Sequence, residues 1–258
     1  MSGYVDLHCH FVAQIDDGCR TVEESAALLS GLHALGFRHV VATPHMRPGM
    51  FDNDQSGLRR AYLSTLSELS AHLAADERPA LSLGSEHFFD ALVVEAIHRG
   101  EGLPYAPDDE ITLTGARHRG TILIEFQDLT PLTVIEAQIF RLVRSGYTPV
   151  IAHPERYRQV WREPELVGRL QDLGSVALLD SGALVGKYGQ NAQDCSRQLL
   201  RDGFYHAACS DAHRPADVRV VAQAMTFIRE EYGDDEVELL FGQGPGELLA
   251  GRRPASML

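Results

Sequence analysis

The chain has 258 residues, of which 44% are hydrophobic and 23% are charged, and its formal net charge is −13. Such a chain is long enough for one α/β domain with a large buried core. The acidic excess argues against nucleic acid as a partner, because that binding needs a basic surface. No apolar run reaches the roughly 18 residues of a membrane span, and the N-terminus reads as a strand without a signal peptide. These features predict a cytoplasmic protein that does not insert into membranes.

Strand-like and helix-like segments alternate from end to end of the chain. A strand at 5–10 is followed by Thr21-Val-Glu-Glu24, a capping-box spacing that predicts a helix to Leu35. Between 53 and 75, apolar residues recur with a period near 3.6, which predicts a second helix. The other expected strands are 40–43, 81–83, 121–126, 148–152, 176–180 and 207–210. The other expected helices are 90–98, 131–145, 164–173, 191–202, 216–232 and 235–241, and an irregular region at 100–118 is expected to form an edge hairpin.

Seven strand–helix units of this kind favour a closed parallel barrel over an open sheet. An open doubly wound sheet gathers its ligand at one switch point, whereas candidate ligands here follow almost every strand. We therefore predict a distorted (β/α)7 barrel of the TIM type, and we expect one domain over residues 1–258, because no linker divides the chain.

Five of the twelve histidines fall at the ends of predicted strands. The carboxyl ends of parallel strands meet at one rim, so these side chains should converge. His8 and His10 are two residues apart on a strand and point to the same face. Asp211 and His213 repeat this arrangement on the last strand, which closure of the barrel places beside the first. The five histidines are His8, His10, His45, His153 and His213.

Carboxylates end two further strands. Glu86 and Glu125 each follow an apolar run, where a carboxylate is costly unless it is paired or bound to a cation. A salt bridge to Arg117 or Arg156 is the alternative. Asp17 lies in an Asp-Asp-Gly turn and is expected to be a ligand, although Asp16 and Asp17 can also be simple turn formers.

The remaining histidines and the cysteines are not predicted to bind metal or to take part in catalysis. His33, His39, His72, His98 and His118 are expected to face solvent, and His87 is expected to pack or to support a ligand. Cys9, Cys19, Cys195 and Cys209 are expected to be reduced thiols. Cys195 and Arg201 match the C-x5-R spacing of thiol-based phosphatases, but the segment has no glycine and reads as mid-helix, so we treat the match as accidental.

Mixed nitrogen and oxygen ligands without thiolate suit Mn²⁺, Fe²⁺, Zn²⁺ or Mg²⁺. Arg156, three residues after His153, is well placed to bind phosphate oxygens with its planar guanidinium.

The order H-x-H, D-D-G, T-P-H, I-E-F, A-H-P-E-R-Y and S-D-A-H resembles the PHP (polymerase and histidinol phosphatase) superfamily. Within it, Thr43-Pro-His-Met-Arg-Pro-Gly-Met-Phe51 and Val150-Ile-Ala-His-Pro-Glu-Arg-Tyr157 resemble the CpsB/YwqE branch of bacterial metal-dependent tyrosine-protein phosphatases. The resemblance runs from Val5 to the C-terminus. It implies a distorted seven-stranded barrel, a PHP domain, with three divalent metal ions, often manganese.

Carried over by motif, the resemblance implies three sets of ligands. His8, His10, Glu86 and Asp211 would hold the first ion, and Glu86 would bridge to a second ion shared with Glu125 and His153. Asp17, His45 and His213 would hold the third. Arg156 matches the phosphate-binding arginine of the family. A second family arginine follows the S-D-x-H motif, where Arg219 is our assignment and Arg214 is the alternative.

The function implied is hydrolysis of phosphotyrosine by water ionised at the metal cluster. A tyrosine autokinase of exopolysaccharide or capsule synthesis is the partner that the resemblance suggests. A small-molecule phosphatase acting on a compound such as histidinol phosphate is the alternative within the superfamily. A metal-bound interaction module without catalysis and an amidohydrolase are further alternatives, although no metal-bridging lysine is evident at a strand end.

Overall fold

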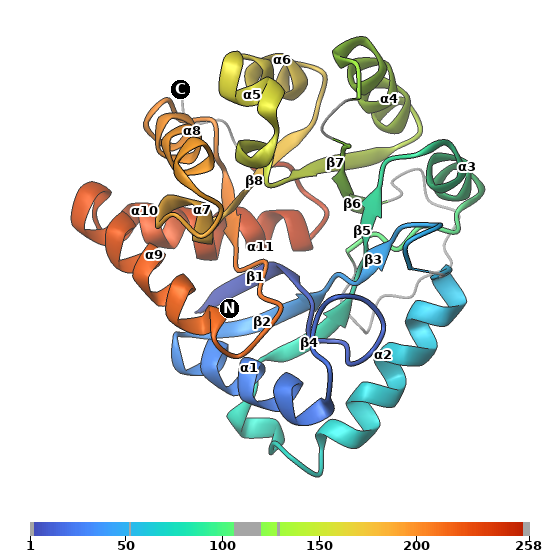
Figure 1. Cartoon of the computed structure of the whole chain (residues 1–258), viewed down its shortest axis with the longest axis vertical. Coiled ribbons are helices and arrows are strands. Elements are labelled where there is room, and N and C mark those ends of the chain that lie inside the picture. Colours follow the sequence, from blue (N-terminus) through green and yellow to red (C-terminus); the bar gives the residue numbers. More distant parts are fainter. Residues whose placement is uncertain (1–2, 52, 106–119, 128–129, 255–258) are drawn as a thin grey trace.

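The structure is a computed structural model that describes residues 3–51, 53–105, 120–127 and 130–254. Its strands lie at the centre and its helices surround them (Figure 1). All the strand ladders are parallel. The strands are β1 (Tyr4–Cys9), β2 (Phe37–Ala42), β3 (His45–Met46), β4 (Ala80–Leu83), β5 (Glu86–Phe88), β6 (Gly120–Glu125), β7 (Tyr147–Ala152), β8 (Val176–Asp180) and β9 (Ala207–Cys209).

The strands are hydrogen-bonded in two sets, β1-β2-β4 and β3-β5-β6-β7-β8-β9. β3 follows β2 after only Thr43 and Pro44, and β5 follows β4 after Gly84 and Ser85. Each of these pairs is therefore one long strand with a short break, and the nine short strands of the described residues make seven. The distorted seven-stranded parallel α/β fold predicted from the sequence is confirmed.

The first strand and the end of the last strand lie side by side. The Asp211 amide donates to the His8 carbonyl and the His10 amide donates to the Ala212 carbonyl, each at 2.9 Å. Asp6, which is fully buried, adds a side-chain link across this junction. Its carboxylate accepts hydrogen bonds from the amide and the hydroxyl of Ser210, at 2.9 and 2.5 Å. Asp6 thus fixes the backbone immediately before Asp211.

Alternate residues of the strands pack into two separate apolar clusters. On β8, Val176 and Leu178 belong to an inner cluster, while Ala177 and Leu179 belong to the larger cluster that includes the surrounding helices. Leu248 of α11 (Gly244–Leu249) also belongs to the inner cluster. This alternation follows from the two-residue period of a strand and fills the barrel with side chains.

The helices follow the predicted order. They are α1 (Val22–Ala34), α2 (Gln55–Leu69), α3 (Ala91–Arg99), α4 (Leu132–Arg144), α6 (Leu166–Asp172), α8 (Gln190–Arg201), α9 (Asp217–Tyr232) and α10 (Asp234–Glu238). Two short helices were not expected, α5 (Arg158–Arg162) and α7 (Ser181–Leu184). Thr21 is confirmed as the N-cap of α1, since its Oγ1 accepts from the Glu24 amide, while the Glu24 carboxylate accepts from the Arg20 amide. Cys195 is buried within α8, which confirms that the C-x5-R match is not a phosphate-binding loop.

One prediction was wrong, and another lies largely outside the described residues. His39 was expected to face solvent, and this was wrong: it is 8% exposed, and its Nε2 lies 2.7 Å from Ser82 Oγ. The reason is that β2 is flanked by both β1 and β4. His118 and most of the expected hairpin at 100–118 lie outside the described residues, although Tyr105 bridges antiparallel to Thr121.

We expect Asp6→Ala to lower the free energy of unfolding by about 2–3 kcal/mol, because the amide and hydroxyl of Ser210 lose a buried acceptor. Asp6→Asn keeps one acceptor and should cost less. Chemical denaturation followed by circular dichroism measures both, with the exposed Asp202→Ala as the control. If Asp6→Ala is as stable as Asp202→Ala, the Asp6 link does not stabilise the barrel.

Candidate metal centre

The candidate ligands lie where the strands end at the carboxyl side of the barrel. Two of them, His153 and Asp211, have positive φ angles of 36° and 41°. Non-glycine residues rarely adopt this left-handed conformation, and it costs on the order of 1 kcal/mol or more. Strain of this kind persists where the surrounding structure needs a side chain in one place. Here it turns both side chains back over the end of the barrel.

The structure brings all nine predicted ligands together. They form four overlapping groups in which the candidate ligand atoms lie within 4.8 Å of one another. The groups are His10, Asp17, His45 and His213; His8, His153 and Asp211; His8, His10 and Glu86; and His45, Glu86 and Glu125. Side chains separated by up to 205 positions therefore meet at one rim. How they are divided among individual ions stays a prediction.

Glu86 lies at the centre of the cluster and is almost fully buried. One of its carboxylate oxygens is 2.8 Å from His153 Nε2 and 3.5 Å from His8 Nε2. The other is 3.0 Å from His45 Nδ1 and 3.5 Å from His10 Nε2. The two oxygens thus face different imidazoles, as expected for a carboxylate that bridges two ions.

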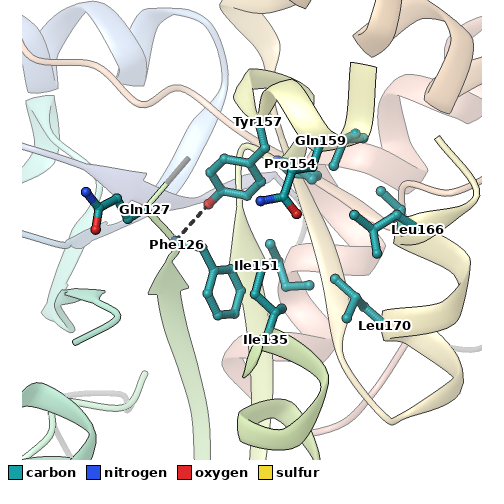
Figure 2. A pocket seen from close by; sticks show the side chains of 11 residues that line it. Phe126, Gln127, Ile135, Ile151, Pro154, Tyr157, Gln159, Leu166 and Leu170 are labelled. Carbon is teal, nitrogen blue, oxygen red and sulfur yellow. Dashed lines mark hydrogen bonds between the residues drawn. The ribbon is translucent and has the colours of Figure 1, made fainter. Parts of the chain in front are cut away.

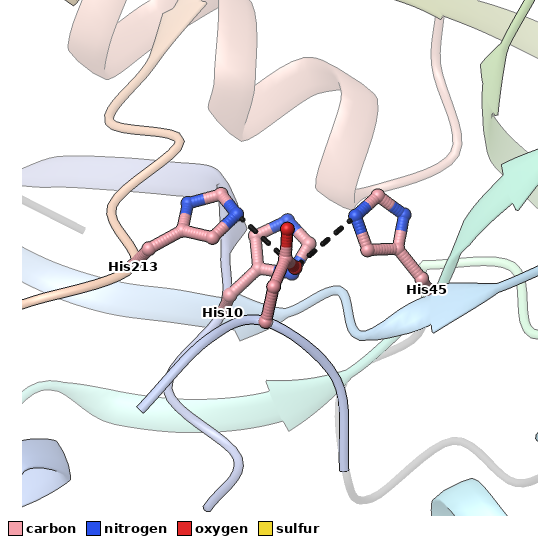
Figure 3. Close-up of side chains that lie close together, drawn as sticks. His10, His45 and His213 are labelled. Carbon is pink, nitrogen blue, oxygen red and sulfur yellow. Dashed lines mark ion pairs between the residues drawn. The ribbon is translucent and has the colours of Figure 1, made fainter. Parts of the chain in front are cut away.

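A second part of the cluster is closer to solvent. Figure 3 shows His45 and His213 joined by ion pairs to one carboxylate, with the ring of His10 near it in this view. The carboxylate is that of Asp17. Asp17 Oδ1 is 3.4 Å from His45 Nε2 and 3.5 Å from His213 Nε2. Hydrogen bonds with His213 and His45 hold the pKa of Asp17 well below its usual range. Asp17, His45 and His213, predicted to hold the third ion, thus lie together.

The donor set fits divalent cations. Several buried ligand atoms have no hydrogen-bond partner among the described residues: His8 Nε2, His10 Nε2, His45 Nδ1, His153 Nδ1, Glu125 Oε2 and Asp211 Oδ1. Buried polar atoms are normally paired, so an unpaired set aimed at one space indicates a ligand. Ligands about 2.1 Å from one ion lie roughly 3 Å apart at right angles, close to the separations seen here.

The pKa values of Glu125 and His153 agree with this interpretation. Burial and the neighbouring Glu86 raise the pKa of Glu125 to about 7, and this outweighs the opposite effect of His45, Arg156 and Arg47. Burial and Arg156 lower the pKa of His153 to about 4, so its imidazole stays neutral. Neutral imidazole is the form that binds a metal. The thiols of Cys9 and Cys209 lie in the apolar clusters instead.

Supporting hydrogen bonds fix the ligands. Asp16, which sequence reasoning left as a possible turn former, lies with its Oδ2 2.9 Å from His10 Nδ1 and accepts from the His45 amide at 3.0 Å. His8 Nδ1 is 2.5 Å from Thr43 Oγ1. In the sequence, only its position beside the predicted ligand Asp17 indicated that Asp16 lies near the site. His87, as expected, packs away from the cluster, where its Nδ1 lies 2.8 Å from the Leu123 carbonyl.

Arg156 lies beside the cluster. It donates to Asp211 Oδ2, its Nη2 is 3.7 Å from Asp180 Oδ2, and its Cζ lies 4.4 Å from the ring centroid of Tyr188. The alternative that Arg156 neutralises Glu86 or Glu125 is not supported, because its described carboxylate partners are Asp211 and Asp180. The other alternative partner, Arg117, lies outside the described residues.

Arg219 and Arg214 were the two candidates for a second phosphate-binding arginine. Arg219 is exposed on α9 and lines a shallow surface groove with residues of the same helix, such as Ala222 and Phe227. Arg214 lies closer to the cluster, and its Nη1 donates to the carbonyls of Asp17, Gly18 and His213. Of these two, Arg214 has the better position, although its Nη1 is already engaged. A role for Arg219 stays a prediction.

An open pocket of about 360 Å³ adjoins the cluster. Glu125, His153 and Arg156 contribute to its wall, together with Arg47, Phe88, Phe126, Gln127 and Tyr157. Behind Phe126 and Tyr157 lies a separate apolar cavity of about 20 Å³, lined by residues such as Ile135, Ile151 and Leu170 (Figure 2). Tyr157 is held in place because its hydroxyl donates to the Ala152 carbonyl and accepts from the Phe126 amide. The open pocket, not the cavity, reaches the predicted ligands.

Comparison with known proteins gives a consistent result. Residues 4–250 match the family described as "Capsular polysaccharide synthesis, CpsB/CapC". The chain is 28% identical to the tyrosine-protein phosphatase YwqE of Bacillus subtilis (strain 168), over 90% of this chain and 86% of the relative. It is 29% identical to the tyrosine-protein phosphatase CpsB of Streptococcus pneumoniae, over 95% of this chain and 98% of the relative.

The fold agrees with a solved structure as well. A chain from the crystal structures of YwqE from Bacillus subtilis and CpsB from Streptococcus pneumoniae, described as unique metal-dependent tyrosine phosphatases, superposes with a TM-score of 0.80. The sequence identity is 26%, and the match covers 97% of this chain and 99% of the other. None of the helices described here is long and apolar enough to cross a membrane.

We expect Asp16→Ala to weaken metal binding about 10- to 100-fold, because His10 and the His45 amide lose the carboxylate that orients them. Titration of the metal-free protein with Mn²⁺, followed by calorimetry, measures this. Asp172→Ala, at an exposed position of α6, is the matched control. An affinity equal to that of the control would show that Asp16 is only a turn former.

Proposed function

The chain belongs to the CpsB/CapC family of capsular polysaccharide synthesis proteins, and we propose that it is a metal-dependent phosphatase that hydrolyses phosphotyrosine in proteins. One observation carries the proposal. The nine predicted ligands converge, and two of them, Glu125 and His153, line an open pocket together with Arg156. This arrangement joins a cation-binding cluster to a group that binds phosphate oxygens.

The ligands proposed for three ions follow the predicted sets. His8, His10, Glu86 and Asp211 would hold the first, Glu86, Glu125 and His153 the second, and Asp17, His45 and His213 the third. We favour manganese, with Fe²⁺, Zn²⁺ or Mg²⁺ as alternatives, because the donors are nitrogen and oxygen. Bound ions would supply ionised water at neutral pH and positive charge toward phosphate oxygens.

The protein's own groups bind and orient the substrate. Arg156 is held by Asp211 and by stacking on Tyr188, so its guanidinium has a fixed plane before substrate arrives. Such preorganised donors stabilise the charge on the phosphate oxygens in the transition state. Aromatic side chains of the pocket, Phe88, Phe126 and Tyr157, offer apolar surface to a phenol ring. Phenolate has a pKa near 10, so it leaves with less acid assistance than an alkoxide.

We propose one PHP domain over residues 1–258, in keeping with the family match over 4–250. A cytoplasmic location agrees with four buried free cysteines. The proposed partner is a phosphotyrosyl protein, in particular a tyrosine autokinase of capsule or exopolysaccharide synthesis.

A substrate panel tests the function. With Mn²⁺ restored, we expect hydrolysis of a phosphotyrosyl peptide, loss of activity after chelation, and much slower turnover of histidinol phosphate. The open pocket favours the peptide, because a metabolite enzyme needs an enclosed site. Faster turnover of histidinol phosphate would favour the small-molecule alternative. No hydrolysis of any phosphoester by metal-loaded protein would refute the proposal.

We expect Arg156→Ala to lower kcat by about 10²-fold, the effect of removing one preorganised oxyanion donor. Arg156→Lys should be intermediate, because it keeps the charge but not the planar fork. Cys195→Ala should behave as the wild type, since no cysteinyl-phosphate forms. Steady-state kinetics on the phosphopeptide, with metal content measured for each variant, provide the readout. An unchanged kcat in Arg156→Ala would remove Arg156 from the mechanism.

A further inference from the structure

One guanidinium at the pocket, that of Arg47, has no polar partner among the residues that the structure describes. Arg47 is half-buried, and its Cζ lies 3.8 Å from the ring centroid of Phe88. Among the described residues, its guanidinium makes this cation–π interaction and no hydrogen bond or ion pair. A guanidinium carries five N–H donors, so Arg47 presents uncommitted donors at the edge of the pocket.

The backbone of Arg47 is fixed close to the metal cluster. It directly follows β3, where His45 pairs with Glu86. Its carbonyl accepts hydrogen bonds from the amides of Met50 and Phe51, at 3.2 and 3.0 Å. The Phe51 ring in turn stacks on His45 with centroids 5.3 Å apart and planes 7° apart. Arg47 is therefore anchored to the segment that carries a predicted ligand.

Arg47 and Arg156 line the same pocket. Two predicted ligands, Glu125 and His153, also line it. A phosphate group that reaches these predicted ligands through the pocket would therefore lie in the field of two guanidinium groups.

The other arginines near the cluster have less to offer an anion. Arg156 already donates to Asp211 and contacts Asp180, Arg214 donates to backbone carbonyls, and Arg219 lies on the outer surface of α9. Of these four, Arg47 alone lines the pocket without forming a hydrogen bond or ion pair with a described residue.

We propose that Arg47 is a catalytic residue that binds an oxygen of the reacting phosphate, and that Phe88 is the positioning residue that holds its guanidinium plane. This inference rests on the proposed phosphatase function and assigns to Arg47 the role for which Arg219 or Arg214 was expected. Because no described residue forms a hydrogen bond or ion pair with the Arg47 guanidinium, its donors can bind the phosphate without breaking such a contact.

The test compares metal-loaded Arg47→Ala, Arg47→Lys and wild type. We expect Arg47→Ala to lower kcat/KM for p-nitrophenyl phosphate about 10- to 100-fold, the range for one charged hydrogen bond. The affinity for inorganic phosphate, measured by calorimetry, should fall about tenfold or more. Arg47→Lys should be intermediate. Phe88→Leu should raise KM and so also lower kcat/KM. Activity should be partly retained, because Arg47 keeps its charge.

The matched control is Arg59→Ala, which removes the same charge from an exposed position of α2. If Arg47→Ala equals this control in both kcat/KM and phosphate affinity at equal metal content, the assignment is wrong. A loss confined to peptides with acidic residues beside the phosphotyrosine would also overturn it, because Arg47 would then bind the peptide. Phosphate affinity separates the two proposals. If wild type hydrolyses nothing but binds phosphate through Arg47, the anion site stands and the phosphatase function fails.

Discussion

The structure depends on the burial of two carboxylates, Glu86 and Glu125, that form no ion pair with a lysine or arginine of the described residues. Glu86 is surrounded by imidazoles, and Glu125 gains only distant help from arginines. Buried charge of this kind is costly unless a cation compensates it. The left-handed backbone at His153 and Asp211 and the Asp6 link across the barrel serve the same arrangement, since each holds ligands where mutual repulsion would separate them. Fold and cation binding are therefore interdependent here.

Much of the fold and cluster could be predicted from the sequence, for a definite physical reason. Parallel strands end at one rim, so a histidine or carboxylate at the end of an apolar run has a predictable position. His8, Glu86 and Asp211 follow this rule, and they meet. His39 did not follow its predicted exposure, because the number of neighbours that a strand has is a property of the assembled sheet.

Residues whose role depends on contacts across the barrel could not be predicted in this way. Asp16 was identified only as part of a turn, because nothing in its own segment shows that His10 and His45 approach it. Asp6 looks like any polar residue in a strand until Ser210 is placed beside it. Arg47 follows a short strand, and its proposed role depends on the pocket that it lines with Phe88, Glu125 and Arg156. Such roles need the tertiary structure.

The two oxygens of Asp211 serve different neighbours. Oδ1 faces His8 and His10 and is unpaired by hydrogen bonds, while Oδ2 accepts from Arg156. A cation on one side and a guanidinium on the other would thus share a single side chain. By thermodynamic linkage, occupancy of one site alters affinity at the other, and the effect is reciprocal. Metal loading would then set how strongly this protein retains its anionic product, so the cell's supply of divalent ions would tune release as well as reaction.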